Sequence, residues 1–212
     1  MSKTQKSETA PRKVLAYSVE TNDPEESTIQ FATSNAAARR QGADEIGTDF
    51  SAVSCRRAQW ADQYANQRFI PAKAYIDAGW WLDCNHCGIR CDSDATHWDE
   101  ETDTDIPLEL VFDGRVVYCS ADCKAEHEAE VAARNTKFEA FKERVVAARL
   151  GVIFTEFTGG YPWCGNKAIF TFPGAQYGGS VSDTRDGLEL KWYVAQGDKA
   201  AWDLFTAEQS AA

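Results

Sequence analysis

The chain has 212 residues, a formal net charge of −11, 43% hydrophobic residues and 26% charged residues. This composition is typical of a globular protein with a buried core, and it excludes a wholly disordered or fibrous chain. No apolar run reaches the roughly 18–20 residues of a membrane helix and no secretory signal opens the sequence, so we expect a cytoplasmic protein without membrane contact.

Residues 1–12 offer almost no apolar surface to bury, and we predict a disordered tail there. Residues 13–79 are predicted to form a small α+β unit. Its first strand places Leu15, Tyr17 and Val19 on one face, which is the alternation of a half-buried strand.

The rest of this unit follows from turn and capping residues. A second strand near residues 28–32 turns Ile29 and Phe31 inward, and a helix runs from a cap at Ser34 to a stop at Gly47. Further elements of this unit are a third strand and two short helices, expected over residues 50–55, 60–65 and 71–79.

Residues 80–150 are predicted to form a metal-binding module with a long helix. A strand enters a cysteine-containing turn, and a hairpin then reverses at Asp113 and Gly114. The helix is expected from Ser120 to about Leu150, with its apolar stripe confined to the second half. That stripe consists of Val131, Phe138, Phe141, Val145 and Ala148.

Residues 151–212 are predicted to be rich in β-strands, which gives the whole chain the α+β class. The expected elements are strands over 152–157, 168–172 and 188–195, a hairpin turn at Asp186 and Gly187, and a helix over 199–205. We expect this last helix to pack through Trp202 and Phe205.

Two pairs of cysteines make the most specific pattern in the sequence. Cys84 and Cys87 form a Cys-x-x-Cys turn, and Cys119 and Cys123 flank the predicted start of the long helix. Unpaired N–H groups and the helix dipole stabilise thiolates at such a start. Four thiolates would give a closed tetrahedral zinc site, which would also stabilise a segment poor in apolar residues.

Other assignments of these residues stay open at the level of sequence. The four cysteines could instead be buried thiols without a metal. Cys91 could replace Cys87 as a ligand, and His127 could bind the metal or a ligand because it lies one helical turn beyond Cys123. His86 is a further possible ligand, whereas His97 is expected to be solvated among acidic residues.

The cysteine motifs also resemble a known class of domain. CNHCG, a hairpin and then YCSADC, over residues 84–130, resemble treble-clef zinc fingers of the TRASH and MYND type. The resemblance implies zinc bound by the four matched cysteines and a role in protein contacts. The chain lacks the second ligand set of MYND domains, and its 31-residue spacer is longer than is usual in TRASH domains.

The whole chain is also similar to uncharacterised phage and prophage proteins. The stretch QFATSNAAARRQGADEIG and the GWW that precedes the first cysteine pair carry this similarity. It implies no activity, and if the protein is phage-encoded, the expected location is the cytoplasm of the host cell.

Negative charge is concentrated between the two cysteine pairs. Residues 81–118 hold ten acidic side chains and two arginines, a net charge of −8. Such a segment repels a phosphate backbone and favours a basic protein partner. The residues predicted to contact that partner, from a solvated loop, are Asp99, Glu100, Glu101, Asp103 and Asp105.

These features favour a non-enzymatic, zinc-stabilised protein-binding module, to which there are two alternatives. Nucleic-acid binding would use a basic cluster formed by Arg39, Arg40, Arg56 and Arg57. An enzyme is disfavoured because a four-thiolate site leaves no open metal position. Cys164, in a Trp-Cys-Gly sequence, lacks the second cysteine that a dithiol redox motif requires.

Overall fold

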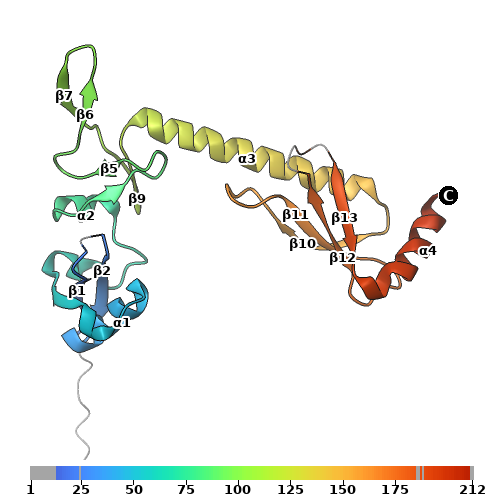
Figure 1. The fold of residues 1–212 in the computed structure, drawn as a ribbon, viewed down its shortest axis with the longest axis horizontal. Helices are drawn as coiled ribbons and strands as arrows, with labels where there is room; N and C mark the ends of the chain where they lie inside the picture. Colours follow the sequence, from blue (N-terminus) through green and yellow to red (C-terminus); the bar gives the residue numbers. More distant parts are fainter. Residues whose placement is uncertain (1–12, 24, 185–186, 188, 211–212) are drawn as a thin grey trace, which may run out of the picture. The chain divides into compact units, whose positions relative to one another are not determined.

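A computed structural model describes residues 13–23, 25–184, 187 and 189–210, so the predicted tail, residues 1–12, lies outside the described residues. The chain divides into two compact units, residues 1–124 and 125–212. Both contain helices and antiparallel strands, which confirms the predicted α+β class (Figure 1). The boundary falls inside the long helix α3 (Ala121–Ala148), so the segment predicted as a metal-binding module contributes to both units.

The first unit begins with a three-stranded antiparallel sheet in the order β2-β1-β3 and a helix, α1, packed on it. Ser34 caps α1 by accepting a hydrogen bond from the Ala37 N–H at 3.3 Å, and Gly47 ends it with a φ of 80°. Both caps confirm the sequence prediction. The bounds are β1 (Leu15–Glu20), β2 (Ser27–Ala32), α1 (Asn35–Ile46) and β3 (Ser54–Arg57).

The prediction of a half-buried first strand was wrong, because β1 is the central strand and is buried on both faces. Tyr17 and Val19 pack towards α1, while Ala16 packs against Ala61 and Ile70 on the opposite face. Close contact with α1 depends on Gly42, since a Cβ there would lie 2.5 Å from a Val19 methyl carbon.

The third strand is also displaced from its predicted position. Residues 50–55 were expected to be extended, but Phe50–Ala52 forms a short 3-10 helix, η1, and the strand starts at Ser54. Antiparallel pairing of Tyr17 with Arg57 fixes this register. The two short helices are present as η2 (Gln59–Tyr64) and α2 (Ala72–Asp77).

The remainder of the first unit consists of three small antiparallel pairs, β4 with β5, β6 with β7 and β8 with β9. The β8–β9 pair is the hairpin predicted at Asp113 and Gly114. The bounds are β4 (Leu82–Asp83), β5 (Arg90–Cys91), β6 (Thr96–Asp99), β7 (Thr104–Pro107), β8 (Val111–Asp113) and β9 (Val116–Tyr118).

The second unit is a four-stranded antiparallel sheet with one face covered by helices. Phe141 and Val145 of α3 and Trp202 and Phe205 of α4 pack on the side chains of β11, as the apolar patterns predicted. The bounds are β10 (Ile153–Thr158), β11 (Lys167–Thr171), β12 (Gly179–Asp183), β13 (Leu190–Val194) and α4 (Lys199–Ser210).

Several details of this unit differ from expectation. Strand β12 was not predicted, because its sequence GSVSD is short and rich in small polar residues. Helix α4 extends to Ser210 rather than to residue 205. Ala148 was placed in the apolar stripe of α3 but is exposed. The hairpin predicted between β12 and β13 is present, although Asp186 itself lies outside the described residues.

Asp198 is a buried carboxylate at the end of the short 3-10 helix η3 (Gln196–Asp198), directly before α4, and it binds the loop before β12. It accepts hydrogen bonds from the N–H groups of Gln176, Tyr177 and Gly178 at 3.0, 2.7 and 2.7 Å. The bond from Gln176 is the main cause of its lowered pKa, with the other two adding to it against the opposing effect of burial. No local pattern in the sequence indicates this role.

We therefore expect Asp198→Asn to lower the thermal unfolding midpoint by about 4–8 °C at neutral pH, because the amide cannot accept all three bonds. The folded-state pKa is lowered, so the carboxylate stabilises the fold above the unfolded pKa of about 4, and this stabilisation is lost as pH falls through the folded value. Thermal melts from neutral to acidic pH should show the variant and the wild type converging. A midpoint no lower than that of Asp203→Asn, an exposed control on α4, would contradict this.

Candidate metal centre

The structure brings together the four cysteines that the sequence singled out. The Sγ atoms of Cys84 and Cys123 are 3.6 Å apart, as are those of Cys87 and Cys119, and all four sulfurs lie within 4.8 Å of one another. Four sulfurs around one zinc ion at 2.3 Å would be about 3.8 Å apart. The cluster therefore has the size and the donor set of a tetrahedral metal site.

The first cysteine pair lies on a tight turn between β4 and β5. The Gly88 N–H donates to the Cys84 carbonyl at 3.0 Å, and the Cys84 N–H donates to the Ile89 carbonyl at 2.8 Å. Gly88 has a φ of 74°, which glycine adopts without strain. The turn thus directs both sulfurs to one side, as the Cys-x-x-Cys-Gly sequence indicated.

The second pair is positioned by the β8–β9 hairpin and by the first turn of α3. The Ser120 hydroxyl accepts a hydrogen bond from the Cys123 N–H at 3.1 Å, which confirms the predicted helix cap. Lys124 forms an ion pair with Asp113 at 3.1 Å and so holds the helix start against the hairpin. These local contacts fix the spacing between the two sulfurs of this pair.

Long-range contacts join the two pairs. The Asn85 N–H donates to the Val117 carbonyl at 2.9 Å, and the Cys119 N–H points at the Cys84 sulfur at 3.4 Å. Val117 and Tyr118 are buried beside the cluster and pack with Ala72 of α2. Backbone hydrogen bonds and packing around β9 therefore bring the two cysteine pairs together, in addition to the contacts between the sulfur atoms.

The electrostatics of the cluster favour one thiolate and oppose additional ones. Burial raises the pKa of the Cys84 thiol. Hydrogen bonds from the backbone N–H groups of Cys87, His86 and Cys119 outweigh this effect and lower the pKa to about 6. Burial raises the pKa values of Cys119 and Cys123, and the charge on Cys84 adds to both rises. A bound cation would remove this repulsion, because it attracts all the thiolates at once.

Cys91 and His127 were predicted as alternative or supporting ligands. Cys91 is fully buried on β5, and its thiol points at the Ile89 carbonyl at 3.6 Å. Burial raises its pKa to about 12, and it lies outside the group of four clustered sulfurs among the described residues. His127 belongs to the second unit, and its support of the site stays a prediction.

The acidic segment is a β-hairpin rather than the predicted loop. Strands β6 and β7 pair from Thr96 with Pro107 to Asp99 with Thr104. The Asp99 carboxylate shapes the turn by accepting from the Glu101 N–H at 3.1 Å and from the Thr102 hydroxyl at 2.7 Å. Local hydrogen bonding by aspartate and threonine thus stabilises a turn in a segment with little apolar alternation.

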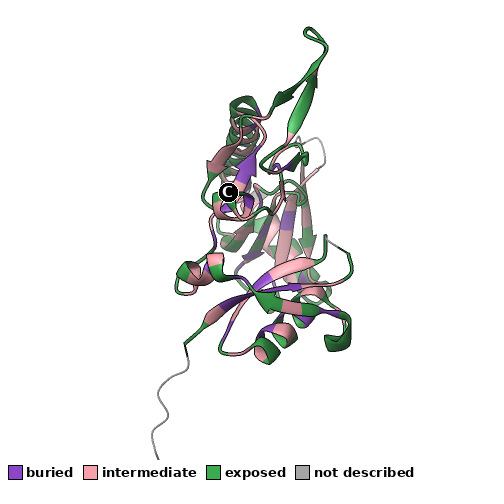
Figure 2. Ribbon diagram, turned by 90° about the vertical axis from the view of Figure 1, so that its left-hand side faces the viewer, coloured by how far each residue is buried: buried purple, intermediate pink, exposed green. Residues whose placement is uncertain are grey.

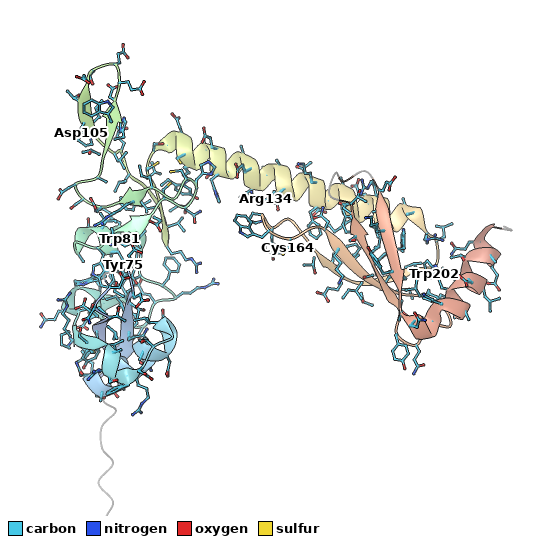
Figure 3. The ribbon with its side chains drawn as sticks, in the orientation of Figure 1. Tyr75, Trp81, Asp105, Arg134, Cys164 and Trp202 are labelled. Atoms are coloured by element: carbon cyan, nitrogen blue, oxygen red, sulfur yellow. The ribbon has the colours of Figure 1, made fainter. Side chains whose placement is uncertain are left out.

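All the acidic side chains predicted to contact a partner lie on this hairpin. Residues 96–107 include five carboxylates and no lysine or arginine, and every one is exposed except the half-buried Asp99 (Figure 2). Figure 3 marks Asp105 on it. Trp98, 56% exposed, and Ile106 add apolar surface to the same hairpin. The β6–β7 hairpin thus exposes negative charge and apolar surface side by side to solvent.

The predicted basic cluster is largely engaged in contacts within the first unit. Arg56 pairs with Glu20 at 3.1 Å, and Arg57 pairs with Asp62 at 2.7 Å. Arg39 stacks on the Phe50 ring at 4.3 Å, and Arg40 is exposed. Arg57 is thus held in a half-buried ion pair, whereas the Arg56 side chain is 71% exposed and Arg40 is exposed, so only part of the cluster is engaged.

Comparisons of the chain with family models, curated proteins and solved structures gave no match. Among the described residues, no helix combines the length with the hydropathy that a membrane span requires. The four-sulfur cluster is therefore the main structural guide to function.

Proposed function

We propose that the protein is a non-enzymatic binding protein whose first unit is stabilised by one zinc ion. The observation that carries this proposal is the group of four sulfurs within 4.8 Å, contributed by two turns far apart in the sequence. Zinc and iron both accept four thiolates in a tetrahedron, and zinc supplies the stabilisation without redox chemistry.

A structural role for the metal follows from the number of ligands. Four thiolates complete the coordination of zinc, so no position stays open for a substrate or an activated water. The resemblance to TRASH and MYND zinc fingers points the same way, because such modules serve protein contacts. The metal would then hold the segment between the cysteine pairs, which includes the β6–β7 hairpin.

The proposed partner surface is the exposed acidic hairpin, and the proposed partner is a basic protein. Five carboxylates attract a lysine- and arginine-rich surface and speed the encounter, while Trp98 supplies apolar contact. The similarity to phage proteins favours a host protein that ordinarily holds nucleic acid, whose site the hairpin would mimic. The nucleic-acid alternative based on the four arginines stays a prediction.

Reversal of hairpin charge tests this proposal. The variant Glu100→Lys, Glu101→Lys, Asp105→Lys keeps Asp99, whose carboxylate shapes the turn. We expect its affinity for an arginine- and lysine-rich peptide, measured by fluorescence anisotropy, to fall by more than about tenfold, because attraction becomes repulsion. Capture of a basic protein from the native host should fall in parallel.

The matched control carries the same change in net charge at other exposed positions, Asp44→Lys, Asp203→Lys and Glu208→Lys. If this control loses as much affinity as the hairpin variant, only the total charge matters and the hairpin is not the binding surface. Unchanged binding by the hairpin variant would refute the proposal directly.

A further inference from the structure

A groove on the second unit combines cationic side chains of α3 with an exposed aromatic loop. It has a volume of about 810 Å³ and lies between α3 and the loop of residues 161–165 that follows β10. Figure 3 marks Arg134 on the helix and Cys164 in this loop. Neither the cysteine cluster nor the acidic hairpin contributes to the groove.

The cationic side of the groove comes from one face of α3. Arg134, Lys137 and Arg144 are spaced by three and seven residues, so they follow one another along the helix surface. Within the described residues, the exposed Lys137 forms no ion pair. Arg134 is half-buried, with 25% of its side chain exposed, and contacts the more exposed Glu130 carboxylate at 3.4 Å. A pair at this distance with a solvated partner holds little energy, so an anion in the groove can compete with Glu130 for Arg134.

The acidic residue among the described lining residues is already neutralised. Asp183 accepts hydrogen bonds from Arg144 and, at 3.0 Å, from the Asn166 amide. Its side chain is only 12% exposed. The groove therefore presents positive charge although the unit as a whole is acidic.

The opposite side of the groove presents flat aromatic surface to solvent. Trp163 is 93% exposed and Tyr161 is 65% exposed, with Pro162 between them. A tryptophan ring so fully exposed contributes little to the folded core, and its faces are open to stacking.

The loop is held beside α3 by its two ends. The Asn166 side chain accepts a hydrogen bond from the Gly160 N–H at 3.4 Å while it donates to Asp183. Gly159 lies so close to Phe138 of α3 that a Cβ there would be 2.5 Å from a ring carbon. The aromatic and cationic sides are thus positioned together before any ligand binds.

We infer that this groove binds single-stranded nucleic acid. Lys137 and Arg134 contact backbone phosphates, and Trp163 and Tyr161 stack on unpaired bases, a combination that single-strand binding surfaces share. A duplex hides the faces of its bases, and an acidic peptide has no bases to stack, so neither uses the exposed tryptophan. The site is independent of zinc and of the proposed basic partner.

The test measures binding of a fluorescein-labelled oligothymidylate to the full chain by anisotropy at rising salt. Trp163→Ala is expected to weaken binding by about 5- to 150-fold, the effect of one lost stacking contact. Lys137→Glu is expected to weaken it by about tenfold and to flatten the slope of log affinity against log salt by about 0.7. Trp163→Phe should retain most of the affinity but lose the tryptophan quenching caused by the oligonucleotide.

Matched controls lie in the same unit. Tyr193→Ala removes an exposed aromatic ring, and Lys191→Glu reverses an exposed cation, both on β13 and outside the groove. Both should bind like the wild type, and all variants should keep the wild-type melting temperature because the changed side chains are exposed.

Several results would overturn the inference. Equal binding of duplex DNA, or of polyglutamate with the same sensitivity to Trp163→Ala, would remove the role of stacked bases. Thymidine monophosphate bound as tightly as the oligomer would indicate a free-nucleotide site instead of a strand. Absence of measurable binding at low salt, or variants indistinguishable from their controls, would exclude the groove.

Discussion

Replacing Cys123 with serine is expected to abolish stoichiometric zinc binding and to unfold the region around the cysteine cluster. The Cys84 and Cys123 side chains are buried, 3% and 7% exposed, and the surrounding strands are only two or three residues long. Such strands contribute little stability by themselves, whereas a zinc site supplies on the order of 10 kcal/mol. Loss of one ligand should remove most of that free energy.

Elemental analysis of reduced, purified protein should give one zinc per wild-type chain and none for Cys123→Ser. Hydrogen exchange should then show lost protection over residues 82–123, while the β10–β13 sheet keeps its protection because its core is separate. Cys164→Ser, an exposed cysteine outside the cluster, is the control and should retain zinc. A reduced wild-type protein that is folded and free of metal would contradict the prediction.

Truncation of Phe170 is expected to destabilise the second unit by about 3–5 kcal/mol. The ring is 1% exposed, and its centroid lies 5.1 Å from that of Trp192 and 5.4 Å from that of Trp202. A Cβ on Gly179 would come within 2.6 Å of the ring, so β12 is already in close contact with it. Phe170→Ala therefore leaves a cavity that the packed neighbours cannot fill.

Denaturant unfolding followed by near-ultraviolet circular dichroism measures this loss, since Trp192 and Trp202 border the cavity. Ile169→Ala is the matched control, because Ile169 is the next residue on β11 but points to the exposed face, with 39% exposure. It should cost less than about 1 kcal/mol. Equal losses for the two variants would mean that Phe170 is not central to the core.

The cysteine cluster is the part of the site that the sequence predicted best. The spacing of Cys84 from Cys87 and of Cys119 from Cys123 places each pair on a local turn, and local turns follow from nearby residues such as Gly88 and Ser120. That the two pairs meet at one site was a hypothesis from ligand chemistry, because four thiolates complete a tetrahedral zinc site.

The acidic hairpin and the groove were not predictable in the same way. Polar and charged residues in β6 and β7 leave no alternation of apolar and polar side chains, so the sequence of this segment is typical of a solvated loop. In the sequence, Trp163 is part of the Trp-Cys-Gly stretch that lacks a second redox cysteine, and no neighbouring residue relates it to Arg134. The exposure of Trp163 follows only from the position of the loop of residues 161–165 in the folded unit.

The sequence alone determined the α+β class, the caps of α1, the start of α3, the β8–β9 turn and the two cysteine pairs, because each depends on residues a few positions apart. The tertiary structure decided that β1 is buried on both faces, that Asp198 caps a distant loop and that aromatic and cationic side chains share a groove. These features depend on contacts between residues about 20 to 50 positions apart, and such contacts form only when whole elements pack.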